Sequence, residues 1–219
     1  MYRKAIILLT LAIGLSVLSS AATLSTVSLD TTPLIGHPAA PFSINFQLND
    51  GSGTGDSNNT AAIDAFDFGG GSATPGTTLV GGASGDLLSG IKITDSGFLN
   101  LFTQGFVPGA QLRFSLLLSA NGDTGGTPDQ FSFAILDSSG FELPYLSVFN
   151  AALVINIQDA SHDIEFAGTD PSASPFGGGD PILMDPPEVS SSVPEPASGL
   201  LIVLGSISIL LSHRRSLRP

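Results

Sequence analysis

Two glycine-rich loops carry pairs of aspartates whose spacing is compatible with calcium binding. Asp50 and Asp56 flank the sequence Gly-Ser-Gly-Thr-Gly, and Asp123 and Asp129 flank a second loop rich in glycine and threonine. Calcium takes about six to eight oxygen ligands, which a flexible loop can supply. Neither loop has the order of acidic residues of an EF-hand, and ordinary hairpin turns explain the same residues equally well. We therefore expect no cofactor, with calcium at these loops as the alternative.

Residue sets for nucleophilic or metal-assisted catalysis are sparse. His37 and His162 are the histidines outside the C-terminal segment, and the chain has no cysteine. The sequence lacks the nucleophile elbow, the phosphate-binding loop, the dinucleotide-binding turn and the zinc-binding His pair. Strand alternation would place His162 on the face opposite Asp163 and Glu165. We therefore expect a protein that is not an enzyme.

Short stretches of alternating apolar and polar residues are the predicted strands, and these strands must position any binding or catalytic site. The clearest predicted strands cover 42–48, 112–118, 131–135 and 153–157, and weaker ones cover 63–68, 90–94 and 163–166. Gly, Asn and Asp turns follow several of them, and no amphipathic helix stands out. This pattern predicts that residues 23–169 form an all-β outer domain, an antiparallel β-sandwich or jelly roll.

The first 22 residues have the features of a secretory signal. Arg3 and Lys4 precede the uncharged apolar run 5–18, and Ser20-Ala21-Ala22 supplies the small residues that signal peptidase reads. We expect cleavage after Ala22, with an uncleaved N-terminal anchor as the alternative. Without cysteine the exported domain has no disulfides, so its core must hold it together.

A second uncharged apolar segment, 197–212, precedes three arginines, Arg214, Arg215 and Arg218. As a helix it would be about 24 Å long, against roughly 30 Å for a hydrocarbon core. Basic residues stay on the cytoplasmic side, so the arginines act as a membrane stop signal and place the preceding chain outside. We expect one transmembrane helix; a buried core helix is the alternative. Residues 170–192, rich in Pro, Gly and Ser, are expected to form a linker, although the apolar run 182–184 would suit a last strand docked on the domain.

The motif Val193-Pro194-Glu195-Pro196 stands directly before the predicted span. Together with the apolar segment and the terminal arginines, it resembles the PEP-CTERM sorting signal, here residues 193–219. The resemblance implies recognition by an exosortase, a membrane-embedded processing enzyme of bacteria that build a polysaccharide biofilm matrix. The same tail is also known as the ice-binding protein C-terminal domain, a label that concerns the tail alone. The phrases FSINFQLNDGSG, FDFGGGS and PDQFSFAILD resemble outer domains of a PEP-CTERM subgroup and imply no activity.

Charge excludes one class of partner. All 19 acidic residues lie between Asp30 and Glu195, where Lys92 and Arg113 are the basic residues. This stretch therefore repels phosphate backbones, and we expect no nucleic acid partner. We expect an inner-membrane-anchored protein that reaches the cell surface or extracellular matrix after processing. Its outer domain would be a non-catalytic binding or structural module, with extracellular polysaccharide as a candidate partner. A polysaccharide hydrolase or lyase is the alternative, because glycosidases need little beyond a pair of carboxylates.

Overall fold

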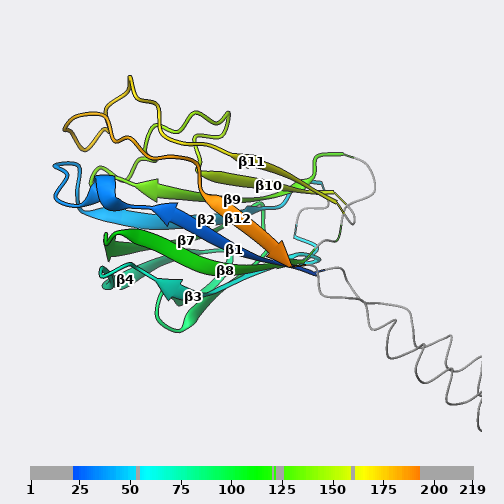
Figure 1. The fold of residues 1–219 in the computed structure, drawn as a ribbon. Helices are drawn as coiled ribbons and strands as arrows, with labels where there is room; N and C mark the ends of the chain where they lie inside the picture. Colours follow the sequence, from blue (N-terminus) through cyan, green and yellow to red (C-terminus); the bar gives the residue numbers. More distant parts are fainter. Residues whose placement is uncertain (1–21, 53–54, 120, 122–125, 159–160, 193–219) are drawn as a thin grey trace, which may run out of the picture.

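The computed structural model describes residues 22–52, 55–119, 121, 126–158 and 161–192, which form two antiparallel β-sheets (Figure 1). Most of the predicted signal segment, the sorting motif, the predicted span and the stop-signal arginines lie outside these residues. Within the described ranges, no helix is long and apolar enough to cross a membrane.

The first sheet has six strands, each antiparallel to its neighbours. In spatial order they are β12 (Glu188–Ser192), β1 (Ala22–Asp30), β8 (Gln111–Ser119), β3 (Thr60–Asp67), β6 (Gly90–Thr94) and β5 (Gly82–Asp86). Burial alternates along β8, with Leu112, Phe114, Leu116 and Leu118 inside. The alternation is the period of a strand whose two faces meet core and solvent.

The second sheet also has six strands. In spatial order they are β11 (Ser161–Phe166), β10 (Leu153–Gln158), β9 (Asp129–Leu136), β2 (Phe42–Asn49), β7 (Leu99–Val107) and β4 (Ser72–Val80). A short 3-10 helix, η1 (Thr32–Leu34), lies between β1 and β2. The strands predicted from alternation are all present, and the all-β prediction of packed antiparallel sheets is confirmed.

Phenylalanine side chains join the two sheets. Phe46 of β2 is fully buried, and its ring lies 5.2 Å from that of Phe114 on β8, in an edge-to-face arrangement. Phe114 also lies 5.2 Å from Phe133 of β9. Such aromatic pairs add about 0.5–1.5 kcal/mol beyond the burial of their apolar area. One hydrophobic core therefore extends between both sheets.

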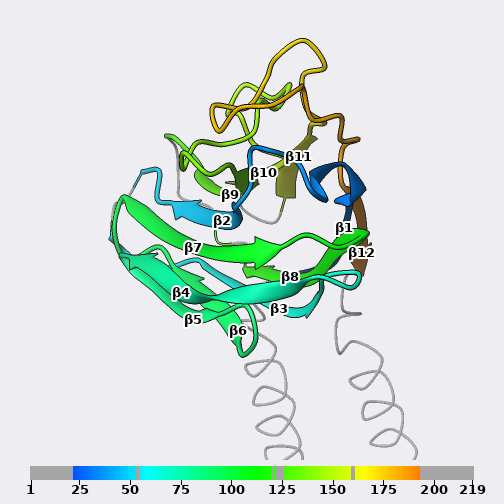
Figure 2. The ribbon, with the colours of Figure 1, turned by 90° about the vertical axis from the view of Figure 1, so that its left-hand side faces the viewer.

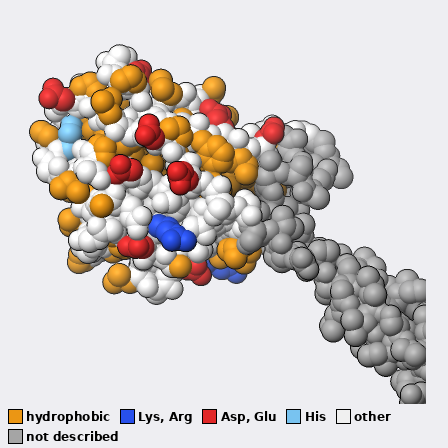
Figure 3. All heavy atoms as spheres, viewed as in Figure 1, with side chains coloured by type: hydrophobic (Ala, Val, Ile, Leu, Met, Phe, Trp, Pro, Cys, Tyr) orange, Lys and Arg blue, Asp and Glu red, His pale blue; other side chains and the backbone are white. Residues whose placement is uncertain are grey.

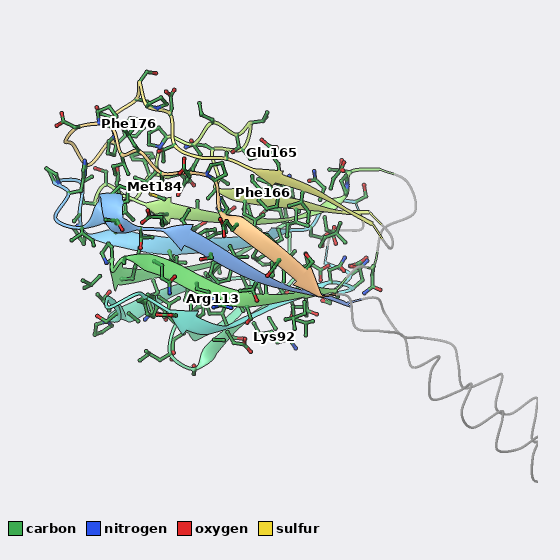
Figure 4. The ribbon with its side chains drawn as sticks, in the orientation of Figure 1. Lys92, Arg113, Glu165, Phe166, Phe176 and Met184 are labelled. Atoms are coloured by element: carbon green, nitrogen blue, oxygen red, sulfur yellow. The ribbon has the colours of Figure 1, made fainter. Side chains whose placement is uncertain are left out.

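The structure corrects the predicted linker at 170–192. Ile182 and Met184 are buried against the core, and residues 188–192 form β12, which pairs with β1 in the register Val27↔Val189 (Figure 4). Hydrogen bonding to β1 and burial of the apolar pair offset the flexibility of a segment rich in Pro, Gly and Ser. The described domain therefore extends to Ser192.

Both ends of the described domain lie at one end of the sandwich, which we call the proximal end. Ala22 is paired with Ser119, and Ser192 is paired with Leu24, so β1 begins where β8 and β12 end (Figures 1 and 2). The opposite end, with the segments 137–152 and 167–187, is called the distal end. The first and last residues of the described domain therefore lie at the same end of the sandwich.

Candidate cation site at the proximal end

Three aspartates and one asparagine meet at the proximal end because each lies where a strand begins or ends. Asp50 follows β2, Asp95 follows β6 and Asp129 begins β9, while Asn59 directly precedes β3. All four residues are at most 3% exposed. We call Asp50, Asp95 and Asp129 the carboxylate cluster.

Two loops that are far apart in sequence bring Asp50 beside Asp129. The Ser52 amide donates to the Thr127 carbonyl at 2.9 Å, and the Gly51 amide donates to Oδ1 of Asp129 at 2.8 Å. A Cβ on Gly51 would stand 2.2 Å from the Thr127 carbonyl oxygen, so the close approach requires glycine here. The described parts of the two glycine-rich loops thus meet beside the paired ends of β2 and β9, where Asn49 lies opposite Gln130.

Asn59 connects this unit to the first sheet. Its backbone amide donates to Oδ2 of Asp95 at 2.8 Å, and its Nδ2 lies 2.7 Å from Oδ2 of Asp129. Its Oδ1 accepts from the Ser119 hydroxyl and from the Asn121 amide, each at 3.0 Å. The backbone and side-chain amides of one buried asparagine therefore fix the relative positions of two carboxylates.

Two carboxylate oxygens of the cluster have no partner. Oδ2 of Asp50 accepts from the Gly55 amide, whereas Oδ1 of Asp50 and Oδ1 of Asp95 are buried without a hydrogen bond. Burial, reinforced by the charges of Asp129 and Asp56, raises the pKa of Asp50. Burial, reinforced by the charges of Asp129 and Asp56, raises the pKa of Asp95 to about 7 against the lowering effect of the Asn59 amide. Acidic groups are thus concentrated in a poorly solvated place, which disfavours their charged form.

The structure places the four predicted calcium-binding aspartates differently. Asp50 and Asp129 come together, although they were assigned to separate loops. Asp56 is exposed, where it accepts hydrogen bonds from the backbone and side chain of Asn58, and Asp123 lies outside the described residues. Asp95 and Asn59 were missed as site residues. The sequence signal that could identify Asp95 and Asn59 is their position directly beside the end of a strand: Asp95 follows β6 and Asn59 precedes β3.

His37 has a structural role in the distal loops. Its Nδ1 accepts from the Ala39 amide at 3.1 Å, and its Nε2 lies 2.9 Å from the Asp180 carbonyl oxygen. Nδ1 therefore bonds within the 31–41 segment, whereas Nε2 joins that segment to 170–187. The side chain of His162 lies outside what the structure describes.

The carboxylate cluster does not line either of two cavities found at the surface of the described domain. One of about 620 Å³ is lined by Asp64, Phe66, Leu87 and neighbouring residues, and a smaller one of about 180 Å³ is lined by Asn45, Gln130, Glu142 and neighbours. Each has a single carboxylate in its lining. A glycosidase requires two, about 5 to 9.5 Å apart.

Comparison with known proteins adds no relative. The chain matches no protein-family model, no curated protein and no solved structure.

Proposed function

We propose that the chain is an exported surface protein, anchored in the inner membrane by its C-terminal segment and released through a PEP-CTERM-type sorting signal. Its β-sandwich would be a non-catalytic binding or structural module of the cell surface or biofilm matrix. The observation that carries the proposal is the pairing of β1 with β12 at the proximal end. A signal preceding β1 and an anchor following β12 would then both face the membrane.

This arrangement would leave the distal end facing away from the membrane. Several apolar side chains are exposed there: Phe141, Leu146, Val148, Phe149 and Phe176. The rings of Phe141 and Phe176 lie 4.8 Å apart, and Figure 4 shows Phe176 far from the proximal end. Exposed apolar groups that gather in one region are typical of interaction surfaces. They support a binding module, with extracellular polysaccharide as one candidate partner.

Charge and cavities also favour binding or structure over polysaccharide hydrolysis. Acidic side chains are spread over the face seen in Figure 3 and do not gather in one hollow. Each of the two cavities described above is lined by one carboxylate, whereas a glycosidase uses a pair of carboxyl groups.

Orientation can be tested with single cysteines, because the chain has none of its own. In a host without the processing enzyme, Val148→Cys should react with a membrane-impermeant maleimide, since Val148 is 88% exposed. The matched control Ser216→Cys lies between Arg215 and Arg218 of the stop signal and should react only after the membrane is permeabilised. Labelling of Ser216→Cys but not of Val148→Cys in intact spheroplasts would overturn the proposed orientation.

Processing requires a second measurement, the intact mass of the released protein from an exosortase-bearing host. Pro194→Ala with Pro196→Ala should leave membrane insertion unchanged but yield a longer, membrane-retained species, because proline keeps the motif extended and accessible. Val203→Arg should instead weaken insertion by roughly 3 kcal/mol. Pro171→Ala, at an exposed position, is the control. A released product that still ends in Arg218-Pro219 would overturn the sorting proposal.

A further inference from the structure

We propose that the carboxylate cluster at the proximal end binds one calcium ion through Asp50, Asp95 and Asp129. The site would be internal to the sandwich, and it does not depend on the proposed sorting or surface function. It also differs from the two-loop arrangement expected from sequence, because Asp95 comes from a third strand end, after β6.

The first argument is charge balance. Three carboxylates are buried at this end, where Asp129 acts electrostatically on both Asp50 and Asp95. The basic side chains of the described domain, Lys92 and Arg113, are both exposed. Strand alternation places Lys92 between the buried Ile91 and Ile93, so its side chain points to the outer face; Arg113 lies on the outer face of β8 in the same way (Figure 4). A buried anion without a counter-charge is strongly unfavourable. A bound cation would supply the missing positive charge.

The second argument is the state of individual oxygens. In Asp50 and in Asp95, one carboxylate oxygen is held by a backbone amide and the other is buried without a partner. The amide bonds fix the orientation of each carboxylate, which leaves its free oxygen to serve as a ligand. Asp129, whose charge acts on both, is held by Gly51 and Asn59 through one hydrogen bond on each oxygen. Each of those oxygens retains a second lone pair.

The third argument identifies the ion. All these ligands are hard oxygen atoms without His or Cys, which suits calcium or magnesium and not zinc. Among the residues that the structure describes, no three acidic, His or Cys side chains are already spaced as a metal site, so the carboxylates must draw together around the ion. Calcium tolerates irregular coordination by about six to eight oxygens, whereas magnesium demands near-octahedral geometry and gives up water reluctantly. The cluster therefore favours calcium.

The test uses the full chain in detergent, stripped with EDTA and titrated with calcium chloride by isothermal titration calorimetry. We expect one ion per chain, with a dissociation constant at or below about 1 mM and weaker binding of magnesium chloride. Thermal unfolding should shift to higher temperature as calcium rises, because the ion binds the folded state preferentially. Absence of both heat and shift at millimolar calcium would overturn the proposal.

Variants locate the site. Asp95→Asn and Asp50→Asn should each lower the calcium association constant at least about tenfold. Asn keeps the side-chain volume and removes a repelling charge, so the stripped variants should unfold at or above the wild-type temperature. Asp185→Asn, an exposed distal position that loses the same charge, should bind calcium as the wild type does. Wild-type affinity in both cluster variants, or equal loss in the Asp185 control, would place the ion elsewhere and overturn the assignment.

Discussion

Leu24 of β1 lies directly opposite Ser192 of β12, the last residue before the Val193–Pro196 motif. The strand that completes the first sheet therefore ends two residues before Pro194, the first proline of the predicted sorting motif. The sandwich is closed by residues that sequence composition assigns to a linker. The stability of this closing strand can be measured directly.

Val189→Asp should release β12. Val189 packs against the core and is paired with the fully buried Val27, so a carboxylate at this position would lose water without gaining a partner. We expect a loss of about 1–3 kcal/mol in the free energy of unfolding and faster proteolysis near residue 189. Ser190→Asp, on the exposed face of the same strand, is the control. Equal stability of the two variants in urea titrations would contradict the packing described for β12.

Phe46→Ala should be among the most damaging core substitutions. The Phe46 ring is fully buried and lies within 6.2 Å, between centroids, of five other phenylalanine rings: Phe66, Phe102, Phe114, Phe131 and Phe133. Truncation would leave a cavity and cost about 3–5 kcal/mol. Phe98→Ala, at a position 70% exposed, should cost far less. Chemical denaturation gives the free energy of unfolding of both variants. If Phe46→Ala lost no more stability than Phe98→Ala, the result would argue against a core shared by the two sheets.

Gly51→Ala should separate the two loops of the cation site. The added Cβ would meet the carbonyl oxygens of Thr127 and Pro128 at 2.2 and 2.5 Å. We expect a loss of about 1–3 kcal/mol in stability, together with weaker calcium binding. At Gly97 the nearest atom to an added Cβ is 3.9 Å away, so Gly97→Ala should change stability little. Thermal unfolding with and without calcium distinguishes them; undiminished calcium affinity in Gly51→Ala would show that the loop contact does not position Asp129.

In EDTA the stability of the folded protein should fall as pH rises from about 4 to 7. The pKa of Asp95 is raised from 3.8 to about 7, by burial first and then by Asp129 and Asp56, against the Asn59 amide. A raised pKa means that the folded state binds the proton more tightly, so its contribution is complete below the unfolded pKa and is lost as pH passes through the folded one. Asp50, whose pKa is also raised, acts in the same direction.

Urea denaturation across this pH range measures the effect. Asp95→Asn should flatten the profile, because it removes the titrating group. The Asp185→Asn control should keep the wild-type slope. Identical profiles for Asp95→Asn and wild type would show that Asp95 does not titrate in this range.

Sequence periodicity predicts the strands whose inward residues are all apolar. It fails for β7, where the inward positions include the amides Asn100 and Gln104, both buried. Asn100 donates to the Leu48 carbonyl at 2.9 Å, and Gln104 accepts from the Leu87 amide at 2.9 Å. Periodicity misses β12 for another reason. Its short, serine-rich sequence has little strand pattern of its own, and it becomes a strand because it pairs with the edge of β1. In both strands, hydrogen bonds to segments distant in the sequence stabilise the strand. The local pattern of apolar and polar residues carries no information about such bonds.

Two of the four residues of the candidate site, Asp50 and Asp129, could be predicted from the sequence. The glycine loops pointed to Asp50 and Asp129, because turn residues and carboxylates stand together in the sequence. Asp95 bonds Asn59 across 36 positions, a contact created by the antiparallel pairing of β3 with β6. Pairing of this kind depends on sheet order, which a single sequence leaves open. The burial that makes these carboxylates unusual is likewise a property of the assembled sandwich.

The direction of β12 has a mechanical consequence. The strand runs along the sandwich toward the proximal end, paired over five residues with β1. If the chain were held at its C-terminal side while the distal end was pulled, the force would act parallel to β12. All the interstrand hydrogen bonds would then be loaded together in shear, whereas a pull across the strand would open them one after another like a zipper. The same five residues would therefore resist rupture best under a load directed along the axis of the strand.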